Sequence, residues 1–187
     1  MKKEKIWNIP NTLSIARIII ALALIYMVFA QFRIISIVIV FTVGMITDFV
    51  DGIIARVFKQ KTEFGRKIDI IADRVLLVGV MTAVVLEFTI RGIITPSNLL
   101  EIALVMSREI IAFPFALLLL ISGREIPPAR FIGKLTTFMQ GIVVPIILLS
   151  IFFEIKFSFY LAILTGIAGV VSASYFIKDS LEARGKR

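Results

Sequence analysis

The sequence contains no cysteine and no histidine. Without cysteine the chain has neither disulfide bonds nor a thiol nucleophile, and without histidine it has no phosphohistidine intermediate. The usual zinc sites, which are built from these two residue types, are excluded as well. Any chemistry must therefore use carboxylates, lysine, arginine, hydroxyl groups and a bound metal.

Apolar residues dominate the composition instead. Of the 187 residues 59% are hydrophobic, and the mean hydropathy is +1.00, whereas a soluble chain is nearer to about 45–50% apolar. One transmembrane helix needs about 20 apolar residues. We therefore predict an all-α integral membrane bundle of six transmembrane helices, which forms a single domain over residues 1–187 without internal repeats.

The breaks between apolar runs place the expected helices. We expect them at about residues 11–30, 34–56, 65–88, 98–121, 131–153 and 157–178. At the start of the fourth helix, Asn98 is followed three residues later by Glu101, a spacing that is typical of an N-cap.

The distribution of basic residues predicts the orientation. If the helices alternate in direction, one side of the membrane holds Arg33, Arg91 and Lys156, and the other side holds the remaining Lys and Arg. The positive-inside rule then places both termini in the cytoplasm. The net charge of +8 fits attraction to an anionic leaflet, so we expect a multi-pass protein of the cell (inner) membrane and no nucleic-acid partner.

Four carboxylates lie close together in an apolar region. Asp48 and Asp51 are three residues apart, Asp69 and Asp73 are four apart, and either spacing puts two side chains on one helix face. A turn between the two helices would bring all four to the cytoplasmic surface. Because hard divalent cations such as Mg²⁺ prefer carboxylate oxygens, we predict a metal site. The alternative is a set of salt bridges that hold the helices together.

A carboxylate site that binds divalent cations is suited to phosphoryl transfer. Paired divalent cations can neutralise a diphosphate, and the planar guanidinium of Arg56 suits phosphate oxygens. Gly52 and Gly65 permit the close approach of a nucleotide or a helix. One carboxylate can take the proton of an attacking hydroxyl group.

These residues form the pattern D-x2-D-G-x2-A-R-x8-G-x3-D-x3-D, which resembles the signature of the CDP-alcohol phosphotransferase family of integral membrane enzymes. Its fixed positions are Asp48, Asp51, Gly52, Ala55, Arg56, Gly65, Asp69 and Asp73. The resemblance implies that Asp48, Asp51 and Asp69 bind two Mg²⁺ ions, for which Mn²⁺ can substitute. It implies that Asp73 completes this site and acts as the general base.

The same resemblance implies a binding site for the CDP-lipid. Its residues are Asp48, Asp51, Gly52, Ala55, Arg56, Gly65 and Asp69. The implied reaction is direct attack of an alcohol hydroxyl on the β-phosphorus of a CDP-linked lipid, with CMP as the leaving group. Members of the family commonly form homodimers, so we expect a homodimer here.

Three further segments concern the acceptor alcohol. Pro10-Asn11-x-Leu13-Ser14-x-x-Arg17, Ser107-Arg108-Glu109 and Gly133-Lys134-x-x-Thr137-x-x-Gln140 resemble segments of phosphatidylglycerophosphate synthases. The subfamily resemblance implies CDP-diacylglycerol and glycerol 3-phosphate as substrates. The neighbours of the last two aspartates, Ile68-Asp69-Ile70 and Ala72-Asp73-Arg74, differ from the Leu-Asp-Pro and Ala-Asp-Lys usual there. Phosphatidylglycerol, as in cardiolipin synthase, and inositol phosphate therefore stay open as acceptors.

A phosphorylated acceptor needs a second basic pocket. We expect Arg108, Arg130, Lys134 and Thr137 to contribute to it. The alternatives are that Arg108 pairs with Glu101 or Glu109, and that Lys134 extends to the lipid headgroups.

Other polar residues have two interpretations each. Arg17 can serve a lipid headgroup or a substrate phosphate. Thr136, Thr137 and Gln140 can line the cavity or form hydrogen bonds between helices. A cation transporter would also use carboxylates within the membrane. We expect a polar path through both halves of the bilayer in a transporter, and the outer halves of the first, second and fifth helices are nearly all apolar.

Overall fold

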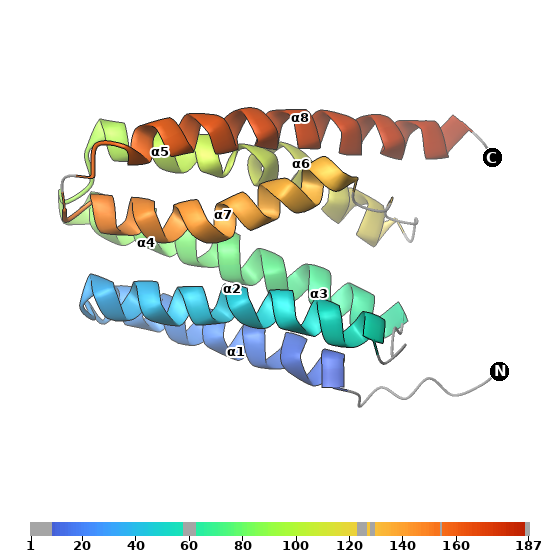
Figure 1. Ribbon diagram of the computed structural model, residues 1–187, viewed down its shortest axis with the longest axis horizontal. Coiled ribbons are helices and arrows are strands. Elements are labelled where there is room, and N and C mark those ends of the chain that lie inside the picture. The colour runs from blue at the N-terminus through green and yellow to red at the C-terminus, as the bar shows by residue number, and fades with distance from the viewer. Residues whose placement is uncertain (1–8, 58–62, 123–126, 128–129, 154, 186–187) are drawn as a thin grey trace. The chain divides into compact units, whose positions relative to one another are not determined.

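The computed structural model describes residues 9–57, 63–122, 127, 130–153 and 155–185. All regular secondary structure in these ranges is helical, and it comprises α1 to α8 and the π-helical turn η1 (Figure 1). The all-α prediction is confirmed. The chain divides into two compact units, Met1–Ile94 and Thr95–Arg187, and each is described by itself.

The first unit is organised around α1. Its elements are α1 (Ile9–Phe29), α2 (Ile34–Val57), α3 (Glu63–Arg74), η1 (Val75–Gly79) and α4 (Val80–Ile90), and α1 packs against all the others. A short turn separates α1 from α2, as predicted, and Gln31 in this turn has a left-handed φ of 61°. Leu24, Phe41 and Val84 lie buried in the core of this unit.

The π-helical turn η1 lies between α3 and α4 and follows Arg74 directly. Turns of this kind often lie at functional sites. Leu76 and Leu77 of η1 are buried, and the α2 backbone approaches closely here, because a Cβ at Gly44 would stand 3.3 Å from the side chain of Leu76. The third predicted helix therefore exists, but with a local widening that the sequence pattern does not reveal.

The second unit is organised around α8. Its elements are α5 (Pro96–Val105), α6 (Ser107–Ile121), α7 (Phe131–Ser150) and α8 (Ser158–Gly185), and α8 packs against the other three. The prediction of Asn98 as an N-cap is wrong. The cap is Thr95, whose side chain accepts a hydrogen bond from the Asn98 backbone N–H, while the Asn98 side chain bonds back to Thr95 N–H. Pro96 occupies the first turn, where it needs no hydrogen-bond donor.

The fourth predicted helix, expected to be continuous over residues 98–121, is broken at Met106. The segments on either side form an angle of 49°. Two hydrogen bonds join the break to neighbouring helices: Gln140 Nε2 of α7 donates to the carbonyl oxygen of Val105 at 2.9 Å, and Ser107 Oγ of α6 donates to the carbonyl oxygen of Gly166 in α8 at 3.1 Å.

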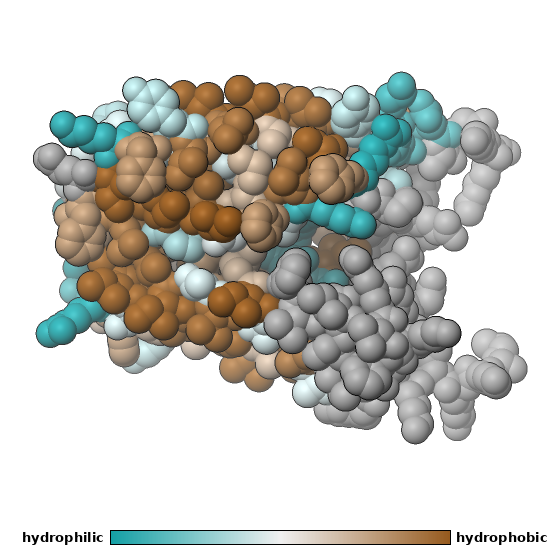
Figure 2. All heavy atoms as spheres, viewed as in Figure 1, coloured by the Kyte–Doolittle hydropathy of each residue, from teal (hydrophilic) through white to brown (hydrophobic). Residues whose placement is uncertain are grey.

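Several helices are suited to a membrane. Within the described ranges, Asn11–Phe29, Phe131–Ser150 and Ser158–Glu182 are long and apolar enough to cross one, and the bent pair α5 and α6 makes a fourth candidate. Figure 2 shows hydrophobic side chains over most of the described surface on the face that it draws. Buried polar residues together with exposed large apolar ones are typical of a membrane protein.

Candidate active site

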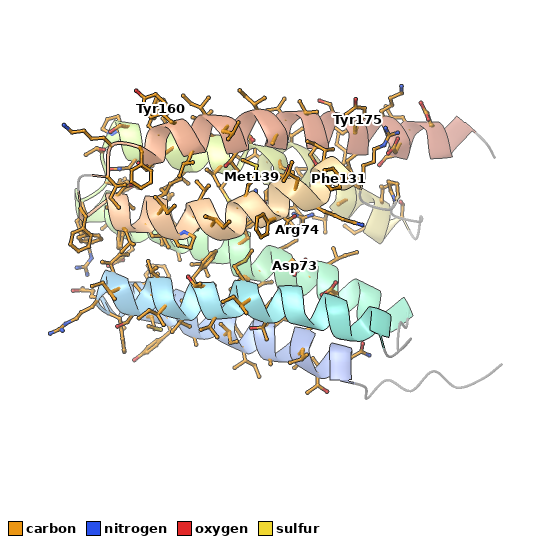
Figure 3. The ribbon with its side chains drawn as sticks, in the orientation of Figure 1. Asp73, Arg74, Phe131, Met139, Tyr160 and Tyr175 are labelled. Atoms are coloured by element: carbon orange, nitrogen blue, oxygen red, sulfur yellow. The ribbon has the colours of Figure 1, made fainter. Side chains whose placement is uncertain are left out.

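Asp69 and Asp73 lie one turn apart on α3, and both contact Arg17 of α1. Arg17 Nη1 donates to Asp69 Oδ1 at 3.2 Å and to Asp73 Oδ1 at 2.5 Å. Figure 3 labels Asp73 on its helix. The i, i+4 spacing therefore does place both side chains on one face, as the sequence predicts.

Arg17 is a basic partner of both aspartates, which the sequence alone does not identify. Its side chain is completely buried, whereas the carboxylate side chains of Asp69 and Asp73 keep 45% and 39% of their exposure. Ser14, one turn before Arg17, donates from Oγ to Asp69 Oδ1 at 3.4 Å. The face of α1 that holds Ser14 and Arg17 is thus directed at the aspartates.

The two exposed carboxylates offer hard oxygen donors, which are the ligands that Mg²⁺ prefers. Their chemistry and exposure fit a divalent cation. Among the side chains that the structure describes, no group of three or more Asp, Glu, Cys or His residues is arranged to hold a metal. The side chains of Asp48 and Asp51, the other two predicted ligands, lie outside that described part.

The remaining signature residues divide between α2 and α3. Asp48, Asp51, Gly52, Ala55 and Arg56 all belong to α2, and their side chains lie outside the described part of the chain. Gly65 belongs to the first turn of α3 and is partly buried. The backbone thus places the first half of the signature at the C-terminal end of α2 and the second half on α3, as predicted.

A second polar cluster surrounds Arg108 at the start of α6. Arg108 Nη1 donates to Thr137 Oγ1 of α7 at 2.5 Å and lies 3.7 Å from Glu109 Oε1. The Arg108 side chain is 15% exposed and that of Glu109 is 2% exposed. The break at Met106 turns this segment, and α7 supplies Thr137, so two predicted acceptor-binding residues do meet.

Glu101, the other partner expected for Arg108, is engaged elsewhere. It is buried on α5, where Oε1 accepts a hydrogen bond from Ser158 Oγ at 2.9 Å and Oε2 accepts one from Ser150 Oγ at 3.3 Å. This carboxylate joins α5 to the end of α7 and the start of α8. The sequence interpretation missed both serines, because they lie about 50 residues away in the chain.

Arg130 and Lys134, the other predicted acceptor-binding residues, lie at the start of α7 in different environments. Arg130 forms a two-pronged ion pair with Asp179 of α8, at 2.8 Å from Nε and 2.6 Å from Nη2, and its Cζ stands 4.7 Å from the centre of the Tyr175 ring. The hydrogen bonds to Asp179 raise the pKa of Arg130 above its ordinary value. Lys134 is exposed in the first turn of α7.

Thr136 and Gln140 form hydrogen bonds between helices. Thr136 Oγ1 donates to the carbonyl oxygens of Ile132 and Ala168, at 2.8 and 3.2 Å, and Gln140 binds the carbonyl of Val105. Both side chains are completely buried. For these two residues the structure favours the interhelical interpretation over a role in lining a cavity.

Comparison with known proteins identifies the family. The family model for CDP-alcohol phosphatidyltransferase matches residues 7–173. Proteins of Rickettsia typhi and Rickettsia prowazekii are each 33% identical over 147 residues, which is 76% of this chain and 77% and 76% of theirs. A Salmonella typhimurium protein is 32% identical over 108 residues, 56% of each chain. All three are named CDP-diacylglycerol--glycerol-3-phosphate 3-phosphatidyltransferase.

The match includes both compact units and all eight positions of the signature. It agrees with the apolar helices and with the carboxylate pair that Arg17 holds on α3. This chain is a membrane protein that belongs to the CDP-alcohol phosphatidyltransferase family.

Proposed function

We propose that the protein transfers the phosphatidyl group of CDP-diacylglycerol to glycerol 3-phosphate and releases CMP. The observation that carries this proposal is the similarity, along 76% of the chain, to relatives that bear the name of this activity. Two carboxylates on α3 and the polar cluster around Arg108 supply side chains that suit such a transfer. The protein is then an enzyme of phospholipid biosynthesis.

Asp73 is the proposed general base. A carboxylate within hydrogen-bond reach of the acceptor hydroxyl takes its proton while the oxygen attacks the β-phosphorus of the CDP-lipid. A bond forms between the acceptor oxygen and that phosphorus, and the bond from the phosphorus to the CMP oxygen breaks. The 39% exposure of the Asp73 side chain supports this role, because the hydroxyl group must reach it.

The family generally depends on a metal, and we propose Asp48, Asp51, Asp69 and Asp73 as its ligands. Two Mg²⁺ or Mn²⁺ ions bound there would neutralise the diphosphate and the charge of the leaving CMP. The proposed CDP-lipid site comprises Asp48, Asp51, Gly52, Ala55, Arg56, Gly65 and Asp69.

Arg108, Arg130, Lys134 and Thr137 are the proposed ligands of the acceptor. Arg108 and Thr137 already share a hydrogen bond, so a phosphate oxygen can be bound by both together. Lys134 is exposed at the start of α7, where it can reach a soluble substrate. Arg130 is paired with Asp179, and its half-exposed guanidinium can also bind the acceptor phosphate. For Arg108, the competing interpretation is a structural pair with Glu109.

We also propose six membrane spans, formed by α1, α2, the continuous segment α3–η1–α4, the bent pair α5–α6, α7 and α8. The exposed Tyr160 lies in the first turn of α8 (Figure 3), where it can mark one of the membrane interfaces at which tyrosines gather. Both termini and the active site lie on the cytoplasmic side of the inner membrane, because the positive-inside rule places the basic loops there.

The family match over residues 7–173 supports the interpretation of the whole chain as one domain. The homodimer remains a proposal that cross-linking in membranes can test. A single band at the monomer mass under conditions that cross-link a known membrane dimer would contradict it.

The acceptor is tested by CMP release from the purified protein in detergent with CDP-diacylglycerol and Mg²⁺. Glycerol 3-phosphate, inositol phosphate and phosphatidylglycerol are added one at a time. We expect CMP with glycerol 3-phosphate and a rate at least tenfold lower with the others, since a missing or misplaced phosphate leaves buried polar groups unpaired. Release with another alcohol alone would keep the chemistry and overturn this acceptor.

A further inference from the structure

Three polar residues of α1 follow one another along one buried face of the helix. Asn11, Ser14 and Arg17 are spaced by three residues, and they are 2%, 3% and 0% exposed. On a membrane-spanning helix, a charged side chain is costly and is almost always paired with another polar group in the interior of the bundle. Buried polar side chains of this kind require polar partners. Ser14 and Arg17 find theirs in the aspartates of α3.

A completely buried guanidinium is costly unless it is paired and hydrogen-bonded. Arg17 contacts both carboxylates through Nη1, which lies 3.2 Å from Asp69 Oδ1 and 2.5 Å from Asp73 Oδ1. The cation thus stands between two carboxylates that would otherwise repel each other one turn apart. Nη1 of Arg17 thus binds two aspartates of the chain itself, an arrangement different from the lipid headgroup and the substrate phosphate that the sequence left open.

We propose that Arg17 is the resident counter-ion of the aspartate pair. It is a positioning residue that compensates the charge of Asp69 and Asp73 when no metal is bound and keeps both carboxylates on one side of α3. Ser14 assists by its hydrogen bond to Asp69. This inference rests on the proposed function to the extent that the two aspartates are metal ligands.

A competition follows from this arrangement. A divalent cation that binds Asp69 and Asp73 must share their oxygens with Arg17, or displace it. Removal of Arg17 takes away the positive charge that lies against both carboxylates, so the metal-free protein loses stability and gains more from metal than the native protein does. A simple packing role for Arg17 predicts the opposite, because a disturbed site binds metal less well.

The test is thermal unfolding of the purified protein in detergent, in EDTA and in excess MgCl₂. We expect Arg17→Gln to lower the Tm in EDTA by about 5–10 °C. Mg²⁺ should then raise the Tm of Arg17→Gln at least about twice as far as it raises that of the native protein. An equal or smaller rise would overturn the counter-ion role.

A second variant separates charge from packing. Addition of Asp69→Asn to Arg17→Gln removes one of the two negative charges that Arg17 contacts in the native protein, so the double variant should have a higher Tm in EDTA than Arg17→Gln alone. Arg91→Gln is the matched control, because Arg91 belongs to the same unit and pairs with Glu87 away from the aspartates. Mg²⁺ should raise the Tm of Arg91→Gln by as much as it raises the Tm of the native protein. A double variant less stable than Arg17→Gln would contradict the proposal.

If Arg17→Gln does not fold, the test is whether the double variant Arg17→Gln/Asp69→Asn folds. The proposal requires that this double variant folds. Turnover gives an independent measurement. Arg17→Lys keeps the charge but loses the guanidinium geometry, and we expect about a tenfold lower kcat, with both substrate KM values within about twofold. A changed KM with unchanged kcat would overturn the positioning role. Because unfolding needs no substrate, a wrong acceptor would leave this result intact and would appear in the CMP assay instead.

Discussion

Gly169 of α8 lies directly against Ser107 at the start of α6. A Cβ added at position 169 would stand 2.5 Å from Ser107 Oγ and 3.2 Å from the backbone nitrogen of Arg108. A side chain at position 169 would therefore have to turn the Ser107 hydroxyl away from its hydrogen bond to Gly166, and it would also stand close to the Arg108 backbone. The contact also fixes the segment that carries Arg108, because Ser107 is itself bound to the carbonyl of Gly166.

Gly169→Ala should therefore act on the acceptor site. The added methyl group pushes α6 outward and moves Arg108 away from Thr137, so the KM for glycerol 3-phosphate should rise by about tenfold, while the KM for CDP-diacylglycerol changes by less than about twofold. Steady-state kinetics in detergent measure both. Ser107→Ala in the same chain removes the clashing oxygen and should restore part of the loss; no restoration would contradict this contact as the cause.

Asp73→Asn tests the general base. The amide keeps the size of the side chain but cannot accept a proton, so kcat should fall by about 10²–10⁴-fold. Binding of the CDP-lipid, measured by equilibrium binding of a radiolabelled substrate, should change much less. Full turnover in this variant would remove Asp73 from the proton transfer.

Lys134→Ala tests the exposed lysine of α7. Loss of a charge that binds the acceptor phosphate should raise the KM for glycerol 3-phosphate by about tenfold or more, with a smaller effect on the KM for CDP-diacylglycerol. Lys156→Ala, an exposed lysine between α7 and α8, is the matched control and should behave as the native protein. Equal effects of Lys134→Ala on the two KM values would indicate a structural or headgroup role.

Glu101→Gln tests the buried carboxylate that Ser150 and Ser158 hold. Hydrogen bonds to a charged acceptor contribute about 1.5–3 kcal/mol each, and glutamine keeps the shape but weakens them. We expect the Tm to fall by about 2–6 °C while both KM values stay within about twofold. A changed KM for glycerol 3-phosphate at unchanged Tm would show that Glu101 serves the substrate and not the packing of α5.

The positions of the helices could be predicted from the sequence, because each apolar run is separated by polar residues, Gly or Pro. The N-cap at Thr95 was missed because Asn98 and Glu101 have the spacing of a capping box, although Pro96 is a competing signal for a start one turn earlier. The break at Met106 has no signal in the apolar pattern. It depends on Gln140, Ser107 and the close approach of α8.

The candidate site shows the same limit. Asp69 and Asp73 were predicted to share a face, because i, i+4 spacing is local information, and they do. The bridge from Arg17 joins residues more than 50 positions apart, and it depends on the packing of α1 against α3. Nothing in the local sequence around Arg17 distinguishes this partner from a lipid headgroup or a substrate.

The central claim is direct transfer from CDP-diacylglycerol to glycerol 3-phosphate, and product stoichiometry tests it most directly. Radiolabelled glycerol 3-phosphate is incubated with the purified protein, CDP-diacylglycerol and Mg²⁺, and the label in extracted lipid is compared with the CMP released. The account predicts one labelled lipid per CMP and no early release of CMP when the acceptor is left out. Label that stays in the aqueous phase, or one equivalent of CMP released without acceptor, would contradict it.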